Sequence, residues 1–171
     1  MAIDALVKPF LALPLFRGLK PLQLTEIVRR ADRIVFKAGD ILISEDQPGD
    51  AAIVIVSGEC VRLDGNDTGA PGEAIPEGSM IGEMAMLIDT TYATTVVARG
   101  QVRALRLNRS EMHELMAEDP KLAQHFTEQI TSRLHKLADE LRTIDQALAD
   151  IAQFSPMDRI AAHDHRALAL H

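Results

Sequence analysis

The chain has 171 residues, 47% apolar and 25% charged, which is enough to bury the core of one domain with an appended element. Its formal net charge of −7 argues against a broad electrostatic surface for nucleic acid. The single cysteine, Cys60, excludes an internal disulfide, and apolar runs such as 51–56 are too short to span a bilayer. We therefore expect a cytoplasmic protein without nucleic-acid or membrane partners, in which Cys60 is a buried structural thiol.

Residues 1–31 form a predicted N-terminal helical segment. The pattern of apolar residues predicts a weakly amphipathic helix over 4–10 and a second short helix over 21–31. Pro21 stands at the first position of the second helix, where its missing N–H and fixed φ are tolerated.

Residues 32–108 change from a helical to an alternating period. Seven short runs rich in β-branched residues follow one another, separated by turn signals of Gly, Asp, Asn and Pro. The runs cover 33–36, 40–45, 51–56, 60–64, 73–75, 94–98 and 102–107. Short strands at this spacing are typical of an antiparallel sandwich or barrel, so the predicted fold class is mainly β with flanking helices.

Residues 109–152 return to a helical pattern. Ser110 is the predicted N-cap of a first short helix. Asp119 and the proline that follows it supply the N-cap and first residue of a longer helix over 120–152. The sequence therefore predicts two consecutive C-terminal helices.

The longer helix carries seven apolar residues whose spacing alternates between four and three. They are Ile130, Leu134, Leu137, Leu141, Ile144, Leu148 and Ile151. Such a stripe either packs on the chain's own domain or forms a seam between two chains. We favour the seam, and hence a homodimer, because 22 residues are more than one small β-domain needs to cover. The tail over 153–171 has little periodicity.

The segment 82–95 combines features of a site for a phosphorylated sugar. Gly82 and Glu83 open a short apolar helical turn, whose start favours anions and whose carboxylate suits ribose hydroxyls. A Thr-rich stretch then leads into a strand. No Arg or Lys lies between Met80 and Ala98, so the cation that such a site usually needs is missing from the segment.

Five motifs in a fixed order carry a resemblance to a known family. They are 15–19 (LFRGL), Gly39-Asp40, Gly49-Asp50, Ser57-Gly58-Glu59 and the cassette 78–87. Over residues 10–145 the chain resembles the cyclic nucleotide-binding domain family of cAMP- and cGMP-binding regulatory domains. The resemblance implies an antiparallel β-roll, or jelly roll (a double-stranded β-helix), with N-terminal helices and a long C-terminal helix. It also implies cAMP or cGMP as ligand and an effector protein as partner.

The same resemblance implies a set of ligand-binding residues. They are Gly82, Glu83, Met84, Ala85, Tyr92, Ala93 and Thr94. Family members have an arginine for the cyclic phosphate at the position of Tyr92. Since hydrogen bonds to charged groups contribute about 1.5–3 kcal/mol each, losing two of them implies roughly 10²–10⁴-fold weaker binding.

Three consequences of Tyr92 stay open at this stage. In the first, another cation such as Arg62, Arg99 or Arg103 replaces the missing one. In the second, the ligand is a different one, less charged or larger. In the third, the pocket is empty or filled by Tyr92. We expect a regulatory domain that binds a cyclic nucleotide weakly or in altered fashion and relays it through the C-terminal helices. The alternative is a ligand-independent dimerisation module of the same fold.

Catalytic and metal-binding motifs are not found in the sequence. It contains no Gly-x-Ser-x-Gly, His-Glu-x-x-His or P-loop pattern, so we expect neither an enzyme nor a metal or cofactor site. His113, His125 and His135 lie on predicted helices, where we interpret them as surface or interface residues.

Overall fold

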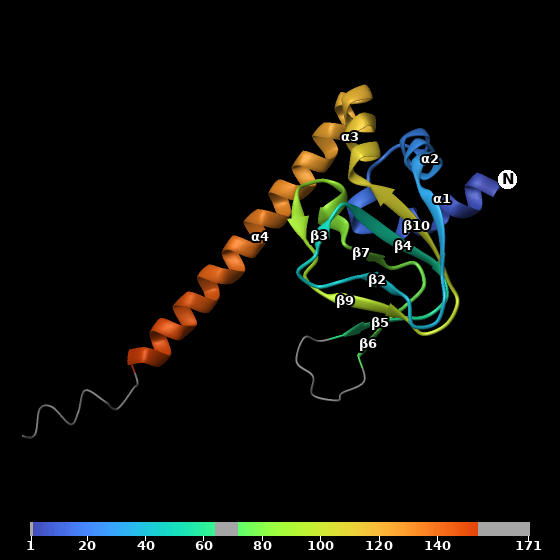
Figure 1. The fold of residues 1–171 in the computed structure, drawn as a ribbon. Coiled ribbons are helices and arrows are strands. Elements are labelled where there is room, and N and C mark those ends of the chain that lie inside the picture. Colours follow the sequence, from blue (N-terminus) through green and yellow to red (C-terminus); the bar gives the residue numbers. More distant parts are fainter. Residues whose placement is uncertain (1, 64–71, 154–171) are drawn as a thin grey trace, which may run out of the picture. The chain divides into compact units, whose positions relative to one another are not determined.

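The computed structural model describes residues 2–63 and 72–153 (Figure 1). Its internal contacts divide the chain into two units, Met1–Thr127 and Glu128–His171. All of the described strands, the first three helices and the start of the last helix belong to the first unit.

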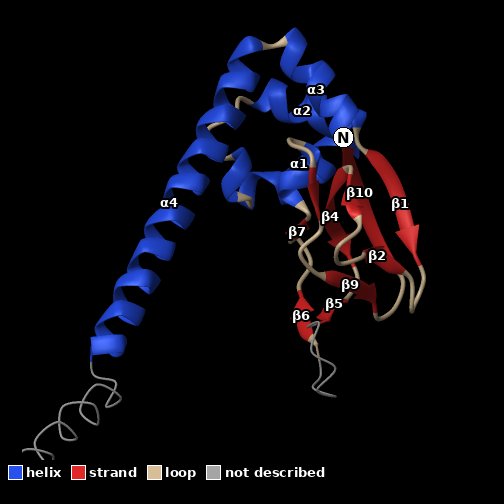
Figure 2. Cartoon of the chain, turned by 60° about the vertical axis from the view of Figure 1, so that its left-hand side comes forward, coloured by secondary structure: helices blue, strands red, loops and turns tan. Residues whose placement is uncertain are grey.

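The N-terminal part of the first unit is helical. It consists of α1 (Ala2–Ala12), the 3-10 turn η1 (Pro14–Phe16) and α2 (Pro21–Arg30). The two helices predicted for this part are therefore present, and both η1 and α2 begin with a proline. Together with α3 they gather at one end of the strands (Figure 2).

The strands form antiparallel sheets, as predicted. They are β1 (Asp32–Phe36), β2 (Ile41–Ile43), β3 (Pro48–Gly49), β4 (Ala51–Ser57), β5 (Cys60–Leu63), β6 (Glu73–Ile75), β7 (Met80–Ile81), β8 (Thr90–Thr91), β9 (Thr95–Ala98) and β10 (Val102–Asn108). One sheet has the order β1-β10-β4-β7, the second has the order β2-β9-β5-β6, and β3 pairs with β8. The two-residue strands β3, β7 and β8 were not predicted.

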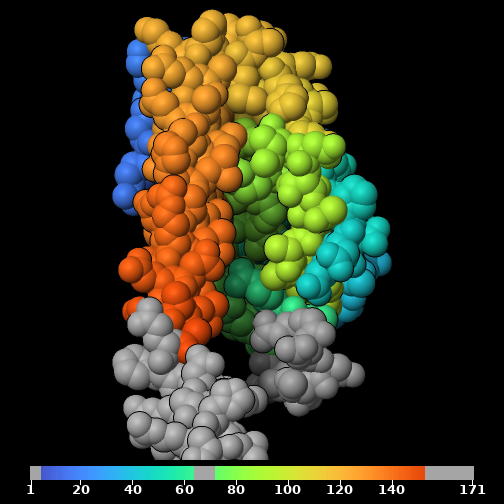
Figure 3. All heavy atoms as spheres, turned by 90° about the vertical axis from the view of Figure 1, so that its left-hand side faces the viewer, coloured from blue at the N-terminus to red at the C-terminus, as the bar shows by residue number. Residues whose placement is uncertain are grey.

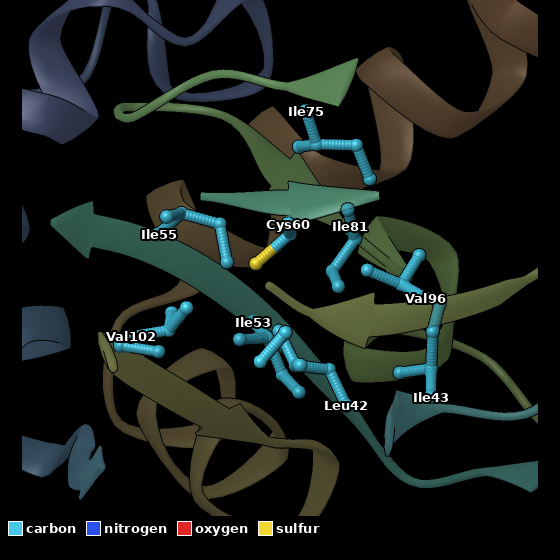
Figure 4. Close-up of a cluster of buried hydrophobic side chains, with 11 residues drawn as sticks. Leu42, Ile43, Ile53, Ile55, Cys60, Ile75, Ile81, Val96 and Val102 are labelled. Carbon is cyan, nitrogen blue, oxygen red and sulfur yellow. The ribbon is translucent and has the colours of Figure 1, made fainter. Parts of the chain in front are cut away.

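The core lies between the two four-stranded sheets. Figure 4 shows side chains from both sheets pointing toward one another, with the sulfur of Cys60 among them. Cys60 is 0% exposed, which confirms the prediction of a buried thiol. Burial raises the pKa of this thiol, and the nearby charge of Glu59 raises it further.

Two helices follow the strands. Strand β10 runs directly into α3 (Arg109–Glu118), so Asn108 occupies the N-cap position, where its side chain donates to Asp32 and does not cap the helix. The predicted cap at Ser110 is therefore wrong, because the backbone is already helical at Arg109. Helix α4 (Pro120–Gln153) begins as predicted: Oδ1 of Asp119 accepts hydrogen bonds from the backbone N–H groups of residues 121 and 122.

The start of α4 is anchored in the first unit by aromatic packing. Phe16 makes edge contacts with Phe10 and with Phe126, at ring-centroid distances of 5.2 and 6.0 Å. All three rings are buried. The α1–η1 segment and the first two turns of α4 thus share one cluster.

The second unit contains the remainder of α4. Six residues of the predicted stripe, from Leu134 to Ile151, are 48–67% exposed, and Ile130 is half-buried. Helix α4 ends one residue beyond the predicted boundary, and the rest of the predicted tail, 154–171, lies outside the described residues. Among the described helices, none combines the length and the hydropathy needed to cross a membrane.

Candidate functional site

The cassette begins where β7 ends. Gly82 has φ +66° and ψ 28°, a left-handed conformation that suits glycine, and it turns the chain into the 3-10 helix η2 (Glu83–Met86). The N–H of Ala85 donates to the carbonyl of Gly82 over 3.0 Å, and Ala85 and Met86 are buried. In the space-filling view the cassette segment, coloured green, lies at the surface next to α3 in yellow (Figure 3).

Tyr92 lies in the centre of this site and points inward. Its backbone N–H donates to the carbonyl of Gln47 over 3.0 Å, and its carbonyl accepts from the N–H of Asp46 over 2.9 Å. Its hydroxyl donates to the carbonyl of Ala51 over 2.9 Å. The ring is half-buried and packs against the apolar core, so the side chain is held at both ends.

Two glycines make room for the ring. A Cβ on Gly82 would lie 2.7 Å from Cε1 of Tyr92, and a Cβ on Gly49 would lie 3.2 Å from the same atom. Real Cβ atoms essentially never come as close as the first of these distances. The Tyr92 ring therefore fills the space beside Gly82, and it shares the space beside Gly49 with Ala85, whose Cβ would lie 2.6 Å from a Cβ on Gly49. The ring brings no positive charge to that space.

The other residues of the predicted site differ in how deeply they are buried. Glu83 and Met84 are half-buried on η2, while Ala85 is buried beneath it. Ala93 is exposed, and Thr94 is half-buried immediately before β9. The structure thus brings Gly82 and Tyr92 into contact, with the remaining residues lying along the chain on either side.

The three alternative cations differ in position. Arg62 is half-buried on β5, and its Nη1 donates to Oε2 of Glu73 over 2.7 Å. Arg99 is exposed in the turn after β9, and Arg103 is exposed on β10. Of these three arginines, Arg62 is the half-buried one.

Two residues that the sequence analysis did not assign to the site tie the cassette to α3. Nη1 of Arg109 donates to the carbonyls of Gly49 and Ile88, over 3.0 and 2.9 Å, and lies 3.3 Å from Oδ1 of Asp89. Nε2 of His113 is 2.8 Å from the carbonyl of Leu87. The sequence carries no signal for these contacts, because the acceptors are backbone carbonyls, which residues of every type possess.

A hollow of about 610 Å³ opens elsewhere on the same unit. It is lined by Gly58, Glu59, Ala74, Ile75, Pro76 and Glu77, around the β5–β6 hairpin. None of the predicted ligand-binding residues lines it.

Known proteins resemble the chain in sequence. The cAMP-dependent protein kinase regulatory subunit of Aspergillus fumigatus is 35% identical over 103 residues, which cover 60% of this chain and 25% of the relative. The chain spans about a quarter of the length of this relative and of two further regulatory subunits of the same name.

Solved structures resemble it in fold. A cyclic nucleotide-binding-like protein from Brucella abortus has a TM-score of 0.60 and 29% identity, covering 65% of this chain and 97% of that one. The N-terminal domain of a transcriptional regulator from Streptomyces coelicolor has a TM-score of 0.68 at 23% identity, covering 75% and 91%, and shares the fold.

The β-roll, the Gly82–Glu83 cassette and the flanking helices agree with these similarities. Residues 33–119, about half of the chain, match the cyclic nucleotide-binding domain as a family. The chain belongs to the cyclic nucleotide-binding domain family.

Proposed function

We propose that this chain is a cytoplasmic, non-catalytic regulatory domain that binds a cyclic nucleotide in an altered fashion and relays binding to a partner protein. The observation that carries the proposal is the position of Tyr92, whose ring lies between Gly49 and Gly82 and whose hydroxyl is bonded to the carbonyl of Ala51. This side chain stands where the family resemblance expects the phosphate-binding arginine.

Tyr92 makes the binding free energy of a nucleotide less favourable than an arginine at the same position would. The Tyr92 hydroxyl gives up its bond to Ala51, and a neutral hydroxyl returns less to a phosphate than a guanidinium does. For the loss of the arginine at this position alone, we therefore infer cAMP or cGMP binding that is roughly 10²–10⁴-fold weaker than in a site that has it.

The relay starts at the cassette. Arg109 and His113 bind carbonyls at the end of the cassette from the first turns of α3. A ligand that displaces η2 must move or break these bonds, and α3 responds in either case. The contacts support a path from the site to the C-terminal helices.

The exposed stripe on α4 supports dimerisation through this helix. Leu137 and Leu141 are 48% and 63% exposed, and burying them against a second copy is favourable. The double variant Leu137→Asp/Leu141→Asp should reduce the mass measured by light scattering by half. An unchanged mass would reject the seam.

Calorimetry with cAMP and cGMP tests the ligand part. Wild-type protein should bind with low affinity, and Tyr92→Arg should tighten cAMP binding by at least about tenfold. At 100 times Kd a ligand stabilises its protein by about 2.7 kcal/mol, so thermal unfolding gives an independent readout. No binding and no stabilisation at millimolar nucleotide would refute this part.

A second function is favoured by the same tyrosine. A ring that closes the pocket permanently would leave a ligand-independent dimerisation module that binds a partner protein. A partner that co-purifies equally with wild type and with Glu83→Ala, and is lost with Leu137→Asp/Leu141→Asp, would favour this second function.

A further inference from the structure

Strand β5 places Arg62 on the face that lines the core. In the sheet register, Cys60 lies opposite Ile75 and Ala98, all three buried. Arg62 is two residues further along and therefore points to the same side as Cys60. Its direct opposite on β9 is Val96, which is 0% exposed. On β6 Arg62 lies opposite Glu73, so the two charged residues occupy neighbouring positions at the end of a face that is apolar at Cys60, Ile75 and Ala98.

The hydrogen-bond donors of the Arg62 guanidinium are only partly satisfied. Its Nη1 is bonded to Glu73, but its Nε is buried without a hydrogen-bond partner among the described residues. A buried donor without an acceptor is costly, and native proteins usually satisfy such a group with water or a ligand. The Nε edge of a guanidinium is also one of the two sides from which arginine binds an oxyanion with paired N–H groups.

We propose that Arg62 supplies the cation that the cassette lacks, and that its Nε edge binds an anionic phosphate oxygen of the nucleotide. The proposal rests on the proposed nucleotide-binding function and assigns the anion to a different strand from the expected one. Thr94, two residues before Val96, lies at the same end of the sheet and adds a hydroxyl donor.

Glu73 weakens the binding of an anion by Arg62. Its carboxylate lies 2.7 Å from Nη1 of Arg62 and is 67% exposed, while the Arg62 side chain is 38% exposed. A carboxylate beside the guanidinium competes with an incoming phosphate for the same charge. Removing that carboxylate should therefore strengthen anion binding, whereas removing the guanidinium should weaken it.

The experiment compares three variants with wild type in phosphate-free buffer. Arg62→Gln should weaken cAMP binding by roughly 10- to 100-fold, as the loss of a charge-assisted hydrogen bond predicts. Glu73→Gln should tighten it by roughly two- to fivefold, the size of a partly exposed ion pair. Arg103→Gln, which removes an exposed arginine of equal charge, should leave the affinity unchanged.

A second readout follows the anion itself. The Nε–H resonance of Arg62, assigned by its loss in Arg62→Gln, should shift on addition of inorganic phosphate or cAMP and remain in place with uncharged adenosine. A shift with phosphate but no binding of cAMP would refute the nucleotide function and leave the anion site standing. Glu73→Gln keeps the guanidinium in place and decides the question even where Arg62→Gln fails to fold: an affinity for cAMP equal to that of wild type would overturn the inference.

Two further results would overturn the inference. Equal cAMP affinity of wild type and folded Arg62→Gln would remove Arg62 from the site while leaving nucleotide binding intact. A resonance that neither phosphate nor cAMP moves would show that the Nε edge binds no anion.

Discussion

Replacing Tyr92 by phenylalanine should separate two effects of this side chain: the hydrogen bond of its hydroxyl and the packing of its ring. The substitution keeps the ring between Gly49 and Gly82 and removes only the hydroxyl that donates to the carbonyl of Ala51 over 2.9 Å. Ala51 is 0% exposed, so water does not easily replace the lost donor.

The expected cost in stability follows from that single bond. A neutral hydrogen bond contributes about 0.5–1.5 kcal/mol, so the free energy of unfolding should fall by about 1 kcal/mol. For a unit of this size, that corresponds to a decrease in Tm of about 2–6 °C. If the ring must leave its place before a nucleotide binds, the same 1 kcal/mol no longer opposes binding. Tyr92→Phe should then bind cAMP about fivefold more tightly.

Urea unfolding and calorimetry on one preparation test both numbers. Thr91→Val, at an exposed neighbouring position, serves as the control and should change neither. Lower stability with unchanged cAMP affinity would refute the reasoning, because the ring would then stay in place when the ligand binds. Unchanged stability would show that the hydroxyl bond contributes nothing.

Three further predictions concern residues that hold the cassette and the neighbouring helices in place. Arg109→Met removes donors to two carbonyls and should lower the free energy of unfolding by about 1–3 kcal/mol, measured in urea. Asp119→Ala should lower Tm at neutral pH. The Gln23 amide lowers the pKa of this carboxyl from its ordinary 3.8, so the difference from wild type should persist above pH 4 and vanish as the pH falls through the lowered value. Gly82→Ala should cost about 1–3 kcal/mol through its positive φ and its contact with the Tyr92 ring, and adding Tyr92→Ala should recover part of that loss.

The longer strands could be predicted because their apolar and β-branched residues report burial. In β10, Val102 and Ala104 are buried on either side of exposed Arg103, and Leu105 and Leu107 on either side of half-buried Arg106. The strands β3, β7 and β8 have two residues each, too few for a period. Their pairing depends on partners elsewhere in the chain.

The sequence predicted which residues belong to the candidate site, but it did not predict the directions in which their side chains point. The sequence places Tyr92 in the cassette, but its inward direction depends on Gly49 and Ala51, which are more than 40 residues away along the chain. The face on which Arg62 lies likewise depends on the register of β5 against β9. Ser110 was assigned as a cap because local sequence does not reveal that β10 continues into α3.

The burial of Cys60 has a practical consequence for following this protein in solution. It is the only cysteine in the chain, and its side chain is shielded within the core. A cysteine introduced at exposed Ala93 would therefore be the only thiol that a fluorescent maleimide reaches while the protein is folded. A dye attached there, beside Tyr92, would report movement of the cassette without prior removal of the native cysteine.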